Sequence, residues 1–224
     1  MSELKKANRN VRKRILEEAV RLFSERGFDG TSIQLIADAV GIRKPSLLYH
    51  FNTKEKLRDE VYEKLMLHWK SELPKLLTSD TSDKDRFTSM IKALVRYFLA
   101  DNHRSRLSIR EMLDRPEIVR DVVREQLNPW VKLICEYIQM GKLNGVVRAD
   151  VNPEAFVTHV IMLVLGSVAV GNVLAAMFDD TQEQSSNHQL ESLVQELERI
   201  LRTSLFEPQY LQAELKPEVS TVEK

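Results

Sequence analysis

A short segment in the first quarter of the chain combines positive charges and hydrogen-bond donors with no carboxylate. Within eight residues it contains Arg43, Lys44, Ser46, Tyr49 and His50. Cations and hydroxyl groups bind phosphate oxygens, and arginine or lysine pairs well with the O6 and N7 acceptors of guanine in the major groove. These residue types, placed on the outside of one short helix, are typical of a helix that reads DNA.

Two helices and a sharp turn are needed to present this segment. Thr31 or Ser32 can cap a first helix that runs through Val40, and Gly41 then reverses the chain where a positive φ costs least. Ala37 must be small because the second helix, over 44–50, crosses close above it. The apolar contacts that lock the two helices together come from Ile36, Val40, Ile42, Leu47 and Leu48.

The turn has a second stiffening residue. Pro45 falls in the first turn of the second helix, where its missing N–H has no partner to lose. A helical hairpin with no binding role is the alternative interpretation of these residues. It explains the small residues at the turn, but it does not explain why donors gather on the outside while acids cluster elsewhere.

Longer helices surround this pair. Apolar residues at helical spacing predict a helix over 8–26, which ends at Gly27, and another over 54–77, which Thr53 opens. The polar stretch at 78–85 breaks the periodicity and predicts a boundary. Further helical patterns cover residues 85–102, 105–114, 117–140, 153–178 and 187–206.

The fold class follows from these patterns. No segment alternates with period 2 for long enough to predict a strand, and glycine and proline number only 7 each. The sequence therefore predicts an all-α protein. The tail over 207–224 contains Pro208 and Pro217 and little apolar surface, so we expect it to be flexible.

The charge is unevenly distributed along the chain. Lys and Arg total 33 and Asp and Glu total 33, but residues 1–58 carry 13 basic and 7 acidic side chains. A basic beginning on an otherwise acidic chain suggests a polyanionic partner for that part alone. A chance fluctuation on solvated helix faces is the competing interpretation.

Several classes of site are not indicated. The single cysteine, Cys135, excludes an intrachain disulfide and a multi-cysteine metal site, and its apolar setting is typical of an inert core residue. The five histidines are scattered, and neither an HExxH motif nor a glycine-rich phosphate loop occurs. We therefore expect no metal, no cofactor and no enzymatic activity.

Targeting signals are also not indicated. Residues 1–10 contain no apolar region of a signal peptide, which favours a cytoplasmic protein. Residues 160–178 approach the length of a membrane span, but no Lys or Arg flanks them and Asn172 lies inside. We expect other helices, including those of a second subunit, to bury this segment, and we expect no membrane partner.

From Asn8 to about Leu67 the chain resembles the TetR family of transcriptional regulators. The resemblance rests above all on Tyr49-His50-Phe51, followed by Lys54-Glu55 and Leu57, and it extends to a set of residues around the turn: Phe23, Gly27, Thr31, Ile36, Ala37, Gly41 and Leu48. It implies a three-helix DNA-binding head over 8–68 with its helix-turn-helix at 31–50, and a helical-bundle body over 78–206 for ligand binding and dimerisation. It also implies an Ω-shaped homodimer that binds a palindromic operator as a repressor and is released by a small hydrophobic or amphipathic effector.

The resemblance also assigns roles within the head. Thr31 and Ser32 can bind phosphate at the opening of a helix, and Tyr49, His50 and Lys54 are similar to residues that clamp the DNA backbone. The candidates for reading base edges are Gln34, Arg43, Lys44 and Ser46, beside the turn-stiffening Pro45. Two departures from the family pattern are Arg43, where a capping Ser or Thr is usual, and Pro45, where a small residue is common. His50 could instead be a structural residue at a helix end.

The last two long helices predict a dimer interface. Small residues recur every four positions on one of them and leucines form a broad stripe on the other, and doubling about a two-fold axis would give a four-helix interface. The candidate interface residues are Ser167, Gly171, Ala175, Leu190, Leu193, Val194, Leu197 and Leu201. An ordinary monomeric core is the alternative.

The middle helices predict an effector pocket. Aromatic and methionine side chains with a few polar groups suit an apolar or amphipathic ligand. The candidate pocket residues are Phe98, Ile109, Met112, Leu113, Trp130, Ile134, Tyr137, Ile138, His159, Met162 and Gly166. At helical spacing these side chains could equally be plain core, in which case the protein would be a ligand-independent DNA-binding regulator, and an activator would grip DNA in the same way.

Overall fold

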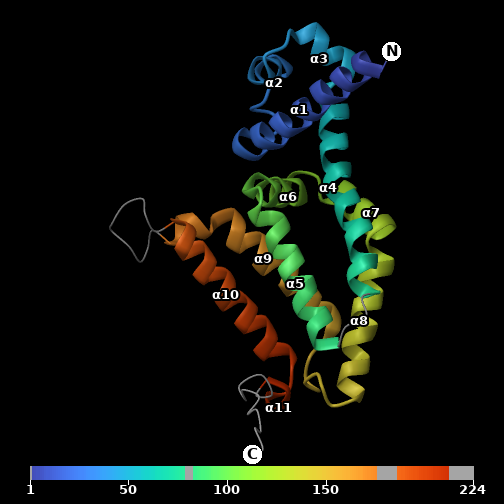
Figure 1. Cartoon of the computed structure of the whole chain (residues 1–224), viewed down its shortest axis with the longest axis vertical. Helices are drawn as coiled ribbons and strands as arrows, with labels where there is room; N and C mark the ends of the chain where they lie inside the picture. Colours follow the sequence, from blue (N-terminus) through green and yellow to red (C-terminus); the bar gives the residue numbers. More distant parts are fainter. Residues whose placement is uncertain (1, 79–82, 176–185, 212–224) are drawn as a thin grey trace, which may run out of the picture. The chain divides into compact units, whose positions relative to one another are not determined.

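The computed structural model describes residues 2–78, 83–175 and 186–211. These residues form helices joined by short turns (Figure 1), in the order α1 (Ser2–Arg26), α2 (Ile33–Val40), α3 (Lys44–His50), α4 (Lys54–Leu77), α5 (Asp83–Leu99), α6 (Asn102–Asp114), α7 (Pro116–Gln126), α8 (Asn128–Leu143), α9 (Pro153–Ala175), α10 (Ser186–Leu205) and α11 (Pro208–Leu211). In the described ranges the extended backbone pairing is an isolated bridge between Val147 and Phe206. The all-α prediction is confirmed.

Several helix boundaries differ from the sequence-based expectation, and three of the differences are the most informative. The first helix begins at Ser2 rather than near residue 8, because residues 4–7 are helix formers without glycine or proline. The helix expected over 117–140 is two helices that part at Leu127, since the ring of Pro129 would clash with the carbonyl four residues earlier in a continuous helix. In the tail that we expect to be flexible, the Glu207 N–H donates to the Val146 carbonyl at 3.0 Å and residues 208–211 form a helical turn, while residues 212–224 lie outside the described residues.

The chain forms two compact units. The N-terminal unit contains residues 1–75 and 96–128, and the C-terminal unit contains residues 76–95 and 129–224. The boundary expected at 78–85 would divide the chain into one N-terminal and one C-terminal part. In the structure each unit consists of two separate chain segments, because α6 and α7 pack with the first helices of the chain.

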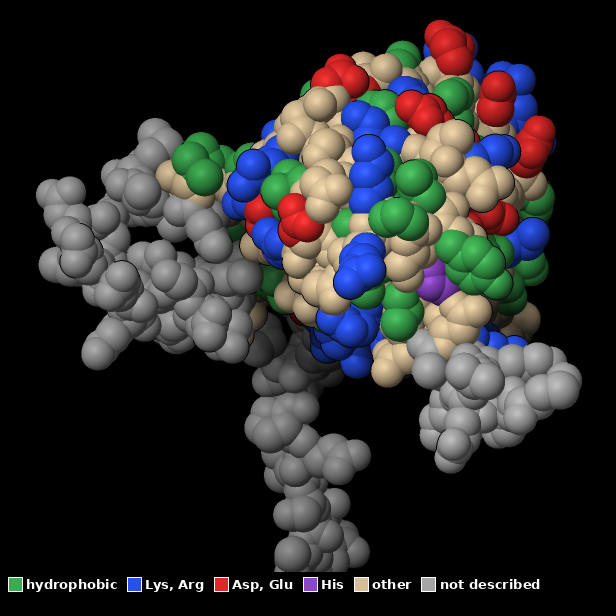
Figure 2. Space-filling model, turned by 90° about the horizontal axis from the view of Figure 1, so that it is seen from above, with side chains coloured by type: hydrophobic (Ala, Val, Ile, Leu, Met, Phe, Trp, Pro, Cys, Tyr) green, Lys and Arg blue, Asp and Glu red, His purple; other side chains and the backbone are tan. Residues whose placement is uncertain are grey.

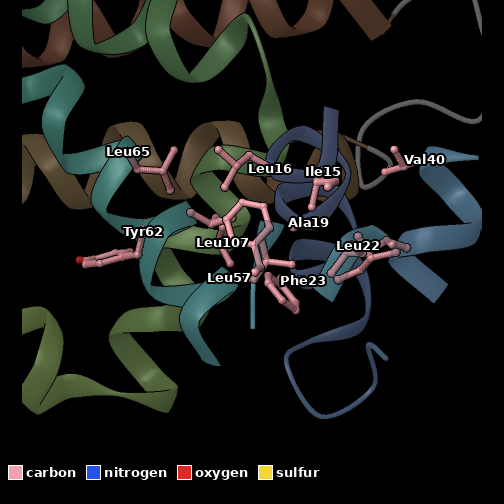
Figure 3. Packing of buried hydrophobic residues seen from close by; sticks show 14 of the residues in the cluster. Ile15, Leu16, Ala19, Leu22, Phe23, Val40, Leu57, Tyr62, Leu65 and Leu107 are labelled. Carbon is pink, nitrogen blue, oxygen red and sulfur yellow. The ribbon is translucent and has the colours of Figure 1, made fainter. Parts of the chain in front are cut away.

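The core of the N-terminal unit joins α1, α2, α4 and α6. Ile15, Leu22 and Phe23 of α1 belong to one buried cluster with Leu57 of α4 and Leu107 of α6, and Figure 3 shows Phe23 beside these two leucines and Leu22 toward α2. All five are at most 2% exposed. Burial of each such side chain stabilises the unit by about 1.5–3 kcal/mol. This core stabilises the short helices α2 and α3, which would not be stable alone.

Polar contacts fasten α1 to α6 as well. Arg110 Nε of α6 donates to the Ser24 carbonyl at 2.9 Å, and His103 Nδ1 lies 2.8 Å from the Ser24 hydroxyl. These contacts satisfy groups in the last turn of α1, where backbone carbonyls have no partner within the helix.

The C-terminal unit is built around α9 and α10, which pack along each other. Val164 and Leu165 of α9 and Leu201 and Leu205 of α10 are buried, and the Phe87 ring of α5 lies 5.5 Å from that of Phe206. Residues 153–171 of α9 are long and apolar enough to cross a membrane by composition alone, a property that core helices of soluble proteins share.

Candidate nucleic-acid interface

The turn between α2 and α3 has the geometry that the sequence predicts. Gly41 has φ 74° and ψ 36°, in the left-handed region, and the N–H of Ile42 donates to the Ala37 carbonyl at 3.0 Å. Ala37 is fully buried where α3 packs against α2, so a larger side chain there would force the helices apart. The two helices therefore form a rigid helix-turn-helix.

The outer side of α3 is solvent-exposed. Arg43, Lys44, Pro45 and Ser46 are all exposed, while Leu47 on the inner side is fully buried. Arg43 is the residue before the helix and its side chain makes no capping bond, as the departure from the usual Ser or Thr predicts. Two cations and a hydroxyl thus project from the start of a short helix, an arrangement that suits the major groove.

The aromatic residues at the end of α3 differ in exposure. Tyr49 is 78% exposed, and its ring meets the half-buried His50 ring edge-on at 5.6 Å. Burial, with a smaller contribution from the Arg12 guanidinium, lowers the pKa of His50 below its ordinary 6.5. His50 is therefore neutral near pH 7, and it can offer phosphate an N–H donor but no charge.

Ser32 and Thr31 have separate roles at the start of α2. The Ser32 hydroxyl accepts the Leu35 N–H at 3.1 Å and caps the helix, one of the two capping options that the sequence left open. Thr31 is fully buried, and its hydroxyl donates to the Gly27 carbonyl at 2.8 Å. The prediction that the Thr31 hydroxyl binds phosphate is wrong for this structure, because the hydroxyl satisfies a carbonyl just beyond α1 instead.

Lys54 and Gln34 already have partners within the unit. Lys54 Nζ donates to the Phe28 carbonyl at 2.9 Å and lies 4.0 Å from the Phe28 ring centre. An ammonium has three N–H donors, so this bond does not exhaust the side chain, and its role as a phosphate clamp stays a prediction. Gln34 Nε2 donates to Asp38 Oδ1 at 2.7 Å and would have to exchange that bond for a base.

Two arginines that hold this surface in place were not singled out from the sequence. Arg12 of α1 forms an ion pair with Glu60 and lies 4.9 Å from the ring centre of Phe51, the residue that follows α3. Arg14 donates to the Val40 carbonyl at the end of α2. Their partners are 26 or more residues away in the chain, so only the folded arrangement reveals them.

Figure 2 shows the surface of this end of the N-terminal unit. Lys and Arg side chains form a band across the middle of the face, with Asp and Glu mostly toward its edges. A band of one charge sign concentrates an oppositely charged polymer near the surface and accelerates its association. Within the described residues, no group of three or more His, Cys, Asp or Glu side chains could hold a metal ion.

The effector-pocket candidates are distributed over both units. Ile134, Tyr137 and Ile138 line a partly open cavity of about 40 Å³ in the C-terminal unit. The other lining residues are Arg86, Phe87, Met90, Gly141, Val146, Val147, Leu205 and Phe206. Trp130, His159, Met162 and Gly166 belong to this unit but do not line the cavity, and Phe98, Ile109, Met112 and Leu113 belong to the N-terminal unit.

The dimer-interface candidates divide by burial. Leu197 and Leu201 are buried within the single chain, as is Gly171, while Ser167 and Val194 are half-buried and Leu193 is exposed. The stripe on α10 therefore supplies core as well as surface, since one face of the helix packs on α9. The side chains of Ala175 and Leu190 lie outside the described set. Further exposed apolar residues on α9, outside the predicted interface set, are Met162, Leu163, Val170, Val173 and Leu174.

Comparisons with known proteins match both parts of the chain. A sequence profile for "Bacterial regulatory proteins, tetR family" matches residues 15–61, and one for "Tetracyclin repressor-like, C-terminal domain" matches residues 84–185. The negative transcriptional regulator IcaR of the biofilm operon icaADBC in Staphylococcus aureus is 42% identical over 50 residues, 22% of this chain and 27% of that protein. The match thus spans about a quarter of the length of that relative.

Two longer matches cover most of the chain. The HTH-type transcriptional regulator RutR of Escherichia coli is 28% identical over 160 residues, 70% of this chain and 71% of RutR. The structure of the ketosteroid transcriptional regulator KstR2 of Mycobacterium tuberculosis superposes with a TM-score of 0.68 at 18% identity, covering 88% of this chain and 95% of that one. With both family profiles matched in chain order and the helix-turn-helix formed as described, the chain belongs to the TetR family of bacterial regulatory proteins.

Proposed function

We propose that the protein is a transcriptional repressor that binds a palindromic operator as a homodimer in the cytoplasm. The observation that carries this proposal is the exposed start of α3, where Arg43, Lys44 and Ser46 project beside a rigid turn while Leu47 anchors the helix in the core. Arginine or lysine at such a position can bind guanine bidentately, and Tyr49 and Ser32 can position the backbone. The similarity to IcaR, named a negative transcriptional regulator, and to RutR, named a transcriptional regulator, supports a role in transcription.

A homodimer is supported by the surface of α9 and α10. Val170, Val173 and Leu174 of α9 and Ile200 of α10 are between 43% and 65% exposed, although α9 is one of the most apolar helices among the described residues. Exposed apolar side chains three and four residues apart on one helix, such as Val170, Val173 and Leu174, are characteristic of an isologous interface between two copies. Two copies would place two α3 helices on the two halves of a palindrome.

We also propose that a small hydrophobic or amphipathic effector releases the protein from DNA. The cavity in the C-terminal unit is lined by apolar and aromatic side chains, and the name of KstR2 refers to ketosteroids. A volume of about 40 Å³ holds only a few water molecules, so an effector would bind after the lining side chains move apart. Such a ligand would favour an open form of the protein over the DNA-bound form.

A second candidate function is compatible with the described cavity. A regulator of the same fold that acts without a small molecule, as a repressor or an activator, needs no larger cavity than this one. The two candidates differ in one observable, because only the first predicts that a ligand dissociates the DNA complex.

The test is a titration of the full-length protein with fluorescent duplexes from the DNA upstream of its own gene. Anisotropy is read at about 50 and 200 mM salt, with a scrambled duplex of the same composition as the control. A specific complex that weakens steeply with salt supports the proposal, and equal weak binding to every duplex contradicts it. Adding decanoate, a bile salt or a planar aromatic amine to the preformed complex then separates the ligand-responsive candidate from the ligand-independent one.

A further inference from the structure

The positive charge of the DNA-binding region is concentrated at the beginning of α1. Residues 4–16 contain six basic side chains and no acidic one, and we call them the cationic segment: Lys5, Lys6, Arg9, Arg12, Lys13 and Arg14. The other Lys and Arg residues of region 1–58 number seven, and its Asp and Glu residues also number seven. The whole excess of positive charge in that region therefore resides in this half of one helix, not in α3.

Packing accounts for two of these cations. Arg12 pairs with Glu60 and lies over the Phe51 ring, and Arg14 binds the Val40 carbonyl. Arg9 and Lys13 are exposed, and the Lys13 side chain retains 67% of its accessible surface. Lys13 lies 3.5 Å from Glu17, an exposed pair one helical turn apart, which is worth only about 0.3–0.5 kcal/mol.

Local helix rules disfavour this arrangement. Arg9 and Lys13 are like charges four residues apart, which destabilises a helix by a few tenths of a kcal/mol. Like charges that oppose the stability of their own helix are expected where they serve binding.

The cationic segment lies at the same end of the N-terminal unit as α3. Arg12 contacts Phe51 directly after α3, and Arg14 contacts Val40 directly before the turn. Arg9 precedes Arg12 by three residues, about 4.5 Å along the helix axis. In Figure 1 the start of α1 accordingly lies on the side of α3, while its end lies by α6.

We infer that Arg9 and Lys13 form a second DNA-binding site, which binds phosphates of duplex DNA beside the groove that α3 enters. The inference rests on the proposed function, because it needs DNA on α3. Contacts to phosphate carry no sequence information, so this site adds affinity and salt dependence equally to every sequence and leaves discrimination to α3.

The test compares two variants of the full-length protein that remove the same charge. Arg9→Gln/Lys13→Gln changes the proposed site, and Arg120→Gln/Arg124→Gln changes two exposed arginines at the same spacing on α7 of the same unit. Binding to the upstream and the scrambled duplex is measured by anisotropy over a series of salt concentrations. Each lost phosphate contact reduces the slope of log K against log salt by about 0.9, so the first variant should lose about 1.8 for each bound subunit, about 3.6 for the homodimer, with an unchanged ratio between the two duplexes.

The possible outcomes are distinct. An unchanged slope for Arg9→Gln/Lys13→Gln, or an equal loss for Arg120→Gln/Arg124→Gln, overturns the inference, while the proposed function still stands if Arg43→Ala/Lys44→Ala loses specific binding. Failure of the unaltered protein to bind any duplex overturns both. The charge-conserving variant Arg9→Lys/Lys13→Arg should retain the original slope, and thermal melting followed by circular dichroism shows whether the variants are folded.

Discussion

Thr31 and Ser32 carry the same functional group at adjacent positions, yet burial gives them different chemistry. Thr31 has no exposed surface and donates to Gly27, whereas exposed Ser32 caps α2 and lies where a phosphate can approach. The same reasoning applies to the cations, because Lys54 contacts the Phe28 ring while Arg43 and Lys44 are exposed to solvent. At the scale of single residues, partners inside the unit decide which side chains remain available to DNA.

Arg43 is expected to contribute to discrimination between sequences. The Arg43→Ala variant should lose about 1–3 kcal/mol of binding free energy on its specific operator and much less on a scrambled duplex, because only the operator offers the guanine contact. Competition titrations with both duplexes measure the two losses. Arg120→Ala, which removes an exposed arginine from α7, is the control, and an equal loss on both duplexes would assign Arg43 to phosphate instead.

Glu111 is expected to stabilise the fold rather than to bind DNA. It is 2% exposed and accepts hydrogen bonds from Arg58 at 2.6 Å and from Arg115 at 2.8 Å. Glu111→Ala would leave the buried Arg58 guanidinium without this partner and should lower the free energy of unfolding by about 3–5 kcal/mol in urea titrations. The double variant Arg58→Met/Glu111→Leu removes both charges and should lose less, and a larger loss for the double variant would contradict this account.

We expect the stability of the N-terminal unit to depend on pH through His50 and His68. Burial is the main cause that lowers the pKa of His50 and of His68, whose ring stacks on Tyr97 at 3.9 Å. Arg12 adds to the effect at His50, and Arg104 and Lys75 add to it at His68, where Glu72 opposes it. The unfolded chain therefore binds protons more readily, so the free energy of unfolding should fall as pH decreases below about 6.5.

Urea titrations at a series of pH values between 7 and 5 measure this effect. His50→Gln/His68→Gln should show a shallower dependence on pH over that range than the unaltered protein. A double variant as sensitive to pH as the original protein would refute the assignment.

At the scale of elements, a single backbone conformation joins α2 to α3. Both helices have fewer than nine residues and would not persist alone in water, so their angle depends on the turn and on the core beneath them. Gly41 provides the left-handed conformation, and Arg14 holds the last carbonyl of α2 from outside. The angle between α2 and α3 therefore depends on the conformation of Gly41 and on the hydrogen bond from Arg14.

Gly41→Ala is expected to destabilise the protein by about 1–2 kcal/mol, because a β-carbon is strained in the left-handed region. No other atom lies within 4 Å of the position such a carbon would take, so the cost is conformational and not steric. Gly166→Ala is the matched control, since that glycine lies inside α9 with equally open space, and the substitution there should stabilise by about 0.5–1 kcal/mol. Thermal or urea unfolding of both variants gives the two signs, and a neutral Gly41→Ala would show that the turn can relax.

At the scale of the whole molecule, the two units have different proposed functions: DNA binding for the N-terminal unit, and dimerisation and effector binding for the C-terminal unit. The N-terminal unit contains the helix-turn-helix together with α6 and α7, and the C-terminal unit contains the small cavity and the exposed apolar surface of α9 and α10. A monomer would present one α3 helix, whereas a homodimer presents two to the same DNA. Linking two binding surfaces in this way raises the overall affinity by about 10²–10⁴.

The dimer proposal gives a prediction for α9. Val170→Glu/Leu174→Glu places two charges on its exposed apolar surface and should yield monomers in light scattering, with operator affinity lower by about 100-fold or more. Leu143→Glu, at an exposed apolar position on α8 of the same unit, should remain dimeric. A double variant that stays dimeric would place the interface elsewhere.

The sequence by itself determined the helices and the recognition motif of this protein. Local signals suffice for these features: the apolar periodicity of α1, the glycine at the turn and the proline-tolerant start of α3 depend on residues within a few positions of each other. Even there, the break between α7 and α8 was missed because the apolar periodicity continues across Leu127 although Pro129 follows it.

Only the tertiary structure decided which of the motif's side chains are available. The Lys54 contact with Phe28, the Arg12 and Arg14 contacts and the buried leucines of α10 depend on partners distant in the chain. The Thr31 hydroxyl bonds to carbonyls only four and nine residues away, but its burial depends on the packed unit. Periodicity identifies an apolar face of a helix but not what covers that face, because burial is a property of the assembled core. The same reason explains why the effector candidates, chosen by residue type along the chain, are spread over two units and only three of them line the described cavity.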